Sequence, residues 1–191
     1  LSRLEYRGYD SAGVAVFDAG TNTLAVHKAK GRIQVLSDQL HGGADLNSTV
    51  GVGHTRWATH GAPSDVNSHP QVSENGRVAV VHNGIIENYA ELRSFLESKG
   101  VSFVSQTDTE VIAQLIEYFY TGDLLSAVDQ ALHRMEGAYA LGIVCADAPD
   151  QIIAVRKDNP LILGWGKGCN FIASDVTAIL KHTRDVSYMN D

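Results

Sequence analysis

The stretch Val50-Gly-Val-Gly-His54-Thr-Arg56-Trp57-Ala-Thr59-His60-Gly61 joins a short apolar run to a crowded polar segment. Residues 50–53 are typical of the end of a strand. Polar side chains just past a strand usually line a ligand site, because loops carry function on a rigid scaffold. Arg56 beside hydroxyl donors is suited to holding a small carboxylate or phosphate, since the planar guanidinium matches these anions bidentately.

Two further polar clusters stand beside apolar runs. His82-Asn83-Gly84 follows Val78-Ala-Val-Val81 in the same manner, and Thr107-Asp108-Thr-Glu110 opens an apolar segment. Together the three clusters predict a site for a zwitterion. They offer a cation for its carboxylate, an anion for its ammonium group, and amide donors for a developing oxyanion.

Length, composition and charge narrow the class of protein. The 191 residues are enough for one domain with a sizeable core, and 44% hydrophobic and 19% charged residues are ordinary for a soluble globular protein. The net charge of -7 argues against nucleic acid as a partner, because phosphate binding needs a basic surface. No apolar run is long enough for a transmembrane helix, so no membrane partner is expected.

The chain start and the cysteines also carry information. The chain begins at Leu1, without Met or a secretion leader, and is interpreted as a fragment. Two cysteines do not make a disulfide framework, which fits a cytoplasmic, reducing setting. Cys145 shares a predicted strand face with Leu141 and Ile143, so a buried and inert thiol is expected. Cys169 lies in a glycine-rich turn, and neither cysteine is interpreted as a nucleophile.

Hydrophobic periodicity predicts strands near both ends of the chain and helices between them. The expected strands are 13–17, 23–27, 138–146, 151–156, 161–165 and 170–174. The expected helices are 33–40, 88–99, a helix opened by a capping box at Thr107 and Glu110, and 126–134. Short strands linked by hairpins, with helices collected in the middle, favour packed antiparallel sheets over a doubly wound sheet.

Taken in order, five segments resemble a known family. They are Arg3-Leu-Glu-Tyr-Arg-Gly-Tyr-Asp-Ser-Ala-Gly13, the segment 54–61, His82-Asn-Gly-Ile-Ile-Glu-Asn88, Thr107-Asp-Thr-Glu110 and Phe171-Ile-Ala-Ser-Asp175. The chain resembles, over essentially its whole length, the glutaminase domain of glucosamine-6-phosphate synthases, which are glutamine:fructose-6-phosphate amidotransferases. These are class II amidotransferases with an N-terminal nucleophile.

The resemblance implies an α+β fold, the four-layer αββα sandwich of N-terminal-nucleophile hydrolases, with two stacked antiparallel sheets flanked by helices. Residues 1–191 would form one glutaminase domain, truncated at its N-terminus. Its activity would be hydrolysis of glutamine to glutamate and ammonia. The C-terminal isomerase domains of the parent chain, absent here, would use that ammonia to convert fructose 6-phosphate to glucosamine 6-phosphate. The parent is expected to be a homo-oligomer, and no metal or organic cofactor is expected.

The family's nucleophile is an N-terminal Cys whose own α-amine acts as base, a reasonable pairing because an α-amine titrates near neutral pH. This chain begins at Leu1, so residues 1–191 alone are expected to be inactive. The resemblance places Arg7 close to that nucleophile. It assigns the oxyanion hole to the side-chain amide of Asn83 and the backbone N–H of Gly84. On the dipeptide alone, Asn83-Gly84 is equally typical of a tight turn, with 85–86 leading into a helical segment.

The resemblance also assigns substrate contacts for L-glutamine and L-glutamate. Arg56 would hold the α-carboxylate, and Thr59 and His60 would add donors. Trp57 would belong to a loop that closes over the substrate, although a lone Trp is more often a core residue. Asp108 would bind the α-ammonium group, and the alternative is an acidic residue in the first turn of a helix.

Two rival classes of function remain open from the residues. His54, His60, His69 and His82 lie near the same predicted strand ends and could form a zinc site of a metal-dependent hydrolase. Their spacing fits no compact metal motif. The second rival is a non-catalytic module that binds an amino acid.

Overall fold

The computed structural model describes residues 1–57 and 60–190. Ten strands, four α-helices and three short 3-10 helices (η) follow one another in this part of the chain: η1 (Ser2–Arg7), β1 (Ser11–Asp18), β2 (Thr23–Lys30), α1 (Ile33–Gln39), η2 (His41–Gly43), β3 (Gly51–Arg56), β4 (Gln71–Val72), β5 (Val78–Ile86), α2 (Tyr89–Ser98), α3 (Asp108–Phe119), α4 (Leu124–Leu132), β6 (Gly137–Cys145), β7 (Ala148–Lys157), β8 (Ile162–Trp165), β9 (Asn170–Ala173), η3 (Val176–Ala178) and β10 (Val186–Tyr188). None of the helices described is long and apolar enough to span a bilayer.

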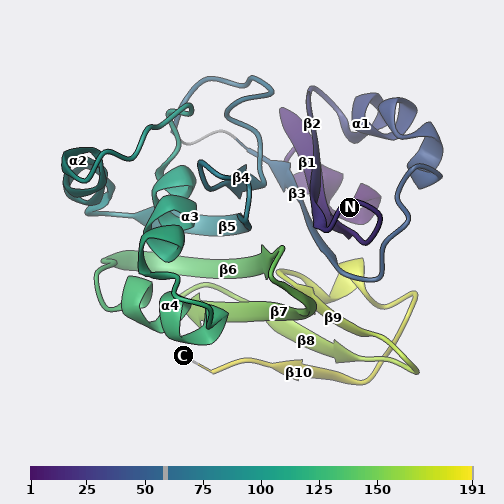
Figure 1. Cartoon of the computed structure of the whole chain (residues 1–191). Helices are drawn as coiled ribbons and strands as arrows, with labels where there is room; N and C mark the ends of the chain where they lie inside the picture. Colours follow the sequence, from purple (N-terminus) through teal and green to yellow (C-terminus); the bar gives the residue numbers. More distant parts are fainter. Residues whose placement is uncertain (58–59, 191) are drawn as a thin grey trace.

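The strands form three antiparallel sheets (Figure 1). The largest has the order β4-β5-β6-β7, and its two central strands pair from Val78 opposite Cys145 to Ile86 opposite Gly137. The other two are three-stranded, with the orders β2-β1-β3 and β10-β8-β9. Four of the antiparallel pairs, β1–β2, β4–β5, β6–β7 and β8–β9, join strands that follow one another in the chain, as in hairpins.

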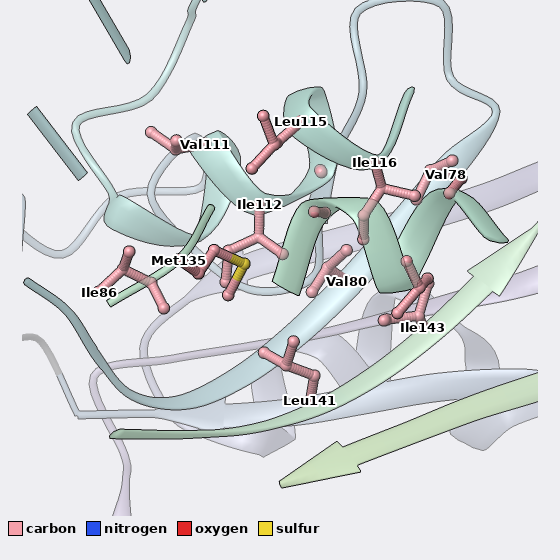
Figure 2. Packing of buried hydrophobic residues seen from close by; sticks show 14 of the residues in the cluster. Val78, Val80, Ile86, Val111, Ile112, Leu115, Ile116, Met135, Leu141 and Ile143 are labelled. Atoms are coloured by element: carbon pink, nitrogen blue, oxygen red, sulfur yellow. The ribbon is translucent and has the colours of Figure 1, made fainter. Parts of the chain in front are cut away.

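Three apolar clusters hold the layers together. The main core packs α2, α3 and α4 on one face of the β4–β7 sheet, and Figure 2 shows Ile112 and Ile116 of α3 over Val80 and Ile143. A second cluster joins the opposite face of that sheet to the β1–β3 sheet, and a third packs α1 on the outer face of β1 and β2. The layer order is therefore α, β, β, α, which confirms the predicted architecture.

The second sheet layer is divided in a way that the sequence does not predict. A cavity of about 620 Å³ lies where β3 and β9, the unpaired edge strands of the two small sheets, approach each other. Consecutive residues line it on both sides, 51–55 from β3 and 170–173 from β9. Because successive side chains of a strand point to opposite faces, lining by consecutive residues means that both strands present their backbone edges to the cavity. We call this space the β3–β9 slot.

The predicted helices are found, with shifted ends that have local causes. The helix expected at 126–134 is α4, which begins at Leu124 because the Asp123 carboxylate caps it by accepting from the backbone N–H of Leu125 at 3.0 Å. The expected capping box of α3 is half formed. Thr107 Oγ1 accepts from the Glu110 N–H at 3.3 Å, but the Glu110 carboxylate accepts instead from the N–H groups of Val104 and Ser105.

Two predicted loop segments belong to strands. The polar residues after 50–53 were expected beyond a strand end, but β3 continues to Arg56. The turn interpretation of Asn83-Gly84 is also wrong, and so is the helical continuation at 85–86, since all four residues lie inside β5. In both places a polar run interrupts the apolar pattern while the backbone pairing continues, because ladder hydrogen bonds do not depend on side-chain polarity. β4 and β10 were not predicted; both are short.

Candidate active site

Asn83 and Gly84 stand side by side in β5 and both line the β3–β9 slot. Gly84 has a φ of 126°, and a Cβ added there would lie 2.0 Å from the carbonyl oxygen of Ala138. Only glycine fits this position without backbone movement. Asn83 and the exposed Gly84 therefore lie together at one wall of the cavity.

Arg7 reaches the same cavity from η1. Its guanidinium lies 3.6 Å from the Asp175 carboxylate, which also accepts from the Tyr6 hydroxyl at 3.0 Å. The next residue, Gly8, lets the chain lie directly on β3, since a Cβ there would come within 2.7 Å of the Thr55 carbonyl oxygen. Arg7 thus sits at the mouth of the slot, where η1 is tied to the segment after β9.

Arg56, at the end of β3, is 3% exposed. Its Nη2 donates to the carbonyl oxygens of His60 and Gly61, the latter at 3.0 Å, while its buried Nη1 has no partner among the described residues. Burial lowers the pKa of the guanidinium from its ordinary value, and the carboxylates of Asp10 and Asp108 act in the opposite direction. A buried cation with an unused donor is suited to a ligand carboxylate.

Asp108 is 4% exposed and is the first residue of α3. Thr107 caps this helix, so a capping role for Asp108 is not needed. One carboxylate oxygen accepts from the backbone N–H of Ile86 at 3.0 Å and lies 3.9 Å from Nδ1 of His82. Asp108 therefore links α3 to β5, and it acts electrostatically on Arg56. Arg56 at the end of β3 and Asp108 at the start of α3 are thus a buried cation and a buried anion, and Asp108 is bonded to the strand that carries Asn83.

The remaining predicted contacts lie around the loop that follows β3. Trp57 is 60% exposed, lines the slot, and touches Tyr9 edge-on with ring centroids 5.2 Å apart, so the core interpretation of this residue is wrong. The His60 ring packs edge-on against Tyr89 of α2 at 5.1 Å, and its Nδ1 is buried. Thr59 lies outside the described residues. Arg56, His60 and Asp108 do not line the slot; Arg56 and Asp108 are buried, and His60 is half-buried.

Comparison with known proteins shows the family to which the chain belongs. The sequence profile described as "Glutamine amidotransferase domain" matches residues 54–181, about two thirds of the chain. The chain belongs to this family.

Curated relatives agree with this assignment. The chain is 56% identical, over all of its length, to the glutamine--fructose-6-phosphate aminotransferase [isomerizing] of Caldanaerobacter subterraneus, and 51% identical to that of Thermotoga maritima. It spans 31% of the length of each of these relatives.

Solved structures agree as well. The B. subtilis glutamine phosphoribosylpyrophosphate amidotransferase superposes with a TM-score of 0.80 at 28% identity, covering 98% of this chain and 40% of that one. A glutamine aminotransferase class-II domain protein from Silicibacter pomeroyi has a TM-score of 0.63 at 15% identity, over 85% of this chain and 79% of that one. The second likeness supports the fold of the amidotransferase domain.

Three of the four histidines proposed for a metal site do meet inside this amidotransferase domain. The rings of His54 and His69 touch edge-on with centroids 4.5 Å apart. Thr109 Oγ1 lies 2.7 Å from Nε2 of His69 and 2.9 Å from Nδ1 of His82, so this hydroxyl bridges two imidazoles. Among the residues with described positions, no three His, Cys, Asp or Glu side chains are placed to share a metal ion. Thr109 joins His69 and His82 by hydrogen bonds, His54 packs on His69, and the ring of His60 packs on Tyr89 instead.

Stability of the amidotransferase domain should fall in acid because of these imidazoles. Burial lowers the pKa of all three, that of His82 to about 4. Between that value and the ordinary His pKa of 6.5, the unfolded chain binds protons that the folded chain does not, so the free energy of unfolding decreases as the pH falls through this window. We expect a loss of roughly 3 kcal/mol from His82 alone.

Urea unfolding from pH 7 to pH 4 measures this loss. His82→Gln should make the pH dependence shallower, whereas the same change at the exposed His133 should leave it as in the parent. An equal slope for His82→Gln and the parent would show that His82 is not held neutral by burial.

The two cysteines of the domain are remote from the oxyanion candidates. Cys145 is 1% exposed in β6, and burial raises the pKa of its thiol, as expected for an inert core residue. Cys169 is exposed in the hairpin between β8 and β9. Neither lines the slot beside Asn83. The interpretation that neither cysteine is the nucleophile therefore agrees with their positions.

Proposed function

We propose that this domain hydrolyses the side-chain amide of L-glutamine to L-glutamate and ammonia, and that it does so when an N-terminal Cys from outside residues 1–191 enters the slot. In the longer protein, the ammonia would pass to sugar isomerase domains that convert fructose 6-phosphate to glucosamine 6-phosphate. The names and lengths of the curated relatives support this second step. Two unpaired cysteines fit a cytoplasmic protein.

One observation carries the proposal: Arg56 is a buried cation whose Nη1 has no partner among the described residues, and the buried Asp108 carboxylate acts on it electrostatically. Asp108 is also bonded to β5, the strand whose Asn83 and Gly84 line the cavity. Arg56 Nη1 would bind the α-carboxylate and the free side of the Asp108 carboxylate the α-ammonium group. This arrangement selects a free amino acid, because each buried charge needs an opposite charge on the ligand. The side chain of the amino acid would then extend toward Asn83.

The chemistry proposed at the slot is acyl transfer. The Cys thiolate forms a bond to the amide carbon, and the oxyanion that develops accepts from Asn83 Nδ2 and the Gly84 N–H. The C–N bond then breaks, and ammonia leaves with the proton that the α-amine took from the thiol. Water cleaves the resulting thioester to release glutamate and restore the thiol. Residues 1–191 by themselves should bind glutamine and glutamate without turnover.

Calorimetric titration of the 191-residue chain with L-glutamine tests the binding half of the proposal. Arg56→Ala should weaken binding roughly 30-fold or more, because a charge-assisted contact contributes on the order of 2 kcal/mol. Arg77→Ala is the matched control; it removes an arginine paired with Glu117 and Asp147 and should leave the affinity unchanged. No heat of binding with the parent chain at any accessible concentration, or equal affinities for the parent and Arg56→Ala, would contradict the assigned role.

Asp108→Asn separates ammonium binding from the structural link to β5. The Asn side-chain oxygen can still accept from the Ile86 N–H, so the free energy of unfolding should change little. The affinity for L-glutamine should fall roughly 10- to 100-fold, since the charge that pairs with the ammonium group is gone. Calorimetry and urea unfolding of the same variant measure both quantities. An unchanged affinity with reduced stability would leave Asp108 as a purely structural residue.

A further inference from the structure

The proposed oxyanion hole depends on which end of the Asn83 amide faces the slot. A side-chain amide carries an acceptor oxygen on one arm and an NH2 donor on the other, and the two arms have nearly the same shape. The NH2 group stabilises an oxyanion, whereas the oxygen repels it. A residue that fixes the amide orientation therefore decides whether this site stabilises or opposes the transition state.

His54 is placed to fix that orientation from the opposite sheet. Its Nε2 lies 2.8 Å from Asn83 Oδ1, and this contact joins β3 of one layer to β5 of the next. Both residues also line the slot. Among the described residues no acceptor contacts Asn83 Nδ2, so with the oxygen held by His54 the NH2 group is left for the cavity.

The surroundings of the His54 ring define which nitrogen carries the proton. Nδ1 is buried and has no partner in the described part of the chain, so a proton there would be an unsatisfied donor. Burial also lowers the pKa of His54, which keeps the ring neutral at pH 7. A neutral ring with a bare Nδ1 carries its one proton on Nε2, and that N–H donates to Asn83 Oδ1.

Neighbouring residues hold the ring in place. His69 packs edge-on against His54, with an interplanar angle of 67°, and is itself bonded to Thr109 of α3. The carbonyl of His69 in turn lies against Gly13 of β1, where a Cβ would come within 2.3 Å of its oxygen. The ring of His54 is thus packed against His69, and His69 is itself held by Thr109 of α3 and by close packing on Gly13 of β1.

We infer that His54 is a positioning residue, which donates from Nε2 to Asn83 Oδ1 and so turns the Asn83 NH2 group toward the reacting carbonyl. This inference rests on the proposed function for its catalytic consequence, but the protonation of His54 is a property of the chain itself. The orientation of the Asn83 amide would be reversed if Nε2 of His54 carried no proton. It would then accept from Asn83, and the amide oxygen would face the slot.

Nitrogen-15 NMR of the 191-residue chain tests the orientation without any activity. The imidazole of His54 should show a protonated Nε2 and an unprotonated Nδ1 at pH 7. Asn83→Ala should expose the Nε2 proton to faster exchange with solvent. A bare Nε2 in the parent chain would overturn the inference, whatever the domain catalyses.

The effect of the Asn83 orientation on catalysis can be measured by kinetics in a longer chain. We call it the Cys-headed chain: residues 1–191 preceded by a strand that begins with Cys and fills the slot. His54→Phe should lower kcat for glutamine roughly 10- to 100-fold with little change in KM, less than the roughly 10²–10³-fold expected for losing the donor itself. His54→Gln, whose NH2 can donate to Asn83, should restore most of kcat. The control is His133→Phe, since His133 is an exposed histidine at the end of α4 that does not line the slot.

A double-mutant comparison distinguishes an effect of His54 through Asn83 from a general effect of His54 on stability. In the Asn83→Ala background, His54→Phe should cost less than about twofold in kcat, because its effect acts through Asn83. Equal losses in both backgrounds would show that His54 acts only through stability and would overturn the inference. If the Cys-headed parent itself releases no glutamate, the proposed function fails, and the NMR result still decides the orientation.

Discussion

Asn83→Ala in the Cys-headed chain is expected to lower kcat for glutamine hydrolysis roughly 10²–10³-fold while KM changes little. Asn83 lines the slot from β5, next to the Gly84 backbone, and is not one of the two charged residues, Arg56 and Asp108, that would bind the ends of the amino acid. Its donor meets charge that exists only in the tetrahedral intermediate, so the loss should appear in kcat and not in ground-state binding.

Steady-state kinetics of glutamate release by the parent and the variant measure kcat and KM separately. Asn75→Ala is a matched control, because Asn75 precedes a glycine in the same way but bonds Glu117 and Ser73 in a turn away from the slot. A kcat within a few-fold of the parent for Asn83→Ala would remove Asn83 from the oxyanion hole. A large rise in KM with unchanged kcat would assign it to substrate binding instead.

Filling the β3–β9 slot is expected to stabilise the domain by on the order of 5 kcal/mol. Two strands present unpaired backbone edges to a cavity of about 620 Å³, and several of the side chains around it are apolar, among them Val52, Val81 and Ile172. A strand placed there would satisfy donors and acceptors on both edges and bury apolar surface on both faces.

Urea unfolding of the 191-residue chain and of the same chain with the added strand measures the difference. The control carries a strand of equal length and composition with two prolines at ladder positions, since Pro cannot donate to a neighbouring strand. The control should resemble the 191-residue chain. Equal unfolding midpoints for all three proteins would mean that the added strand does not pair with β3 and β9 in the slot.

The part of the fold that local patterns determine could be predicted from the sequence. α3 was expected because Thr107 and Glu110 precede an apolar face at helical spacing, and the Thr107 half of the expected capping box is formed. β5 was recognised from Val78 to Val81 only, because His82 and Asn83 interrupt the apolar pattern while the backbone pairing continues. The division of the second sheet layer depends on which edges meet in space, and no local pattern records that.

The candidate site likewise has a part that the sequence predicts and a part that only the structure shows. The resemblance indicated Arg56, Asn83 and Asp108. In the structure Asn83 lines the slot, whereas Arg56 and Asp108 are buried and do not line it. The resemblance gave no sign that His54 contacts Asn83, or that Asp175 ties η1 to the segment after β9. These contacts join residues that lie far apart in the chain. The four histidines did stand out as a group, but their chemistry depends on Thr109, which the metal interpretation did not include.

Glutamate release from L-glutamine by the Cys-headed chain, compared with the same chain headed by Ala, tests the central claim most directly. The account predicts turnover with the Cys head, none above background with the Ala head, and none from the 191-residue chain. It also predicts that the activity survives Cys145→Ala and Cys169→Ala together. Turnover by the Ala-headed chain, or an inactive Cys-headed chain that is folded and binds glutamine, would contradict it.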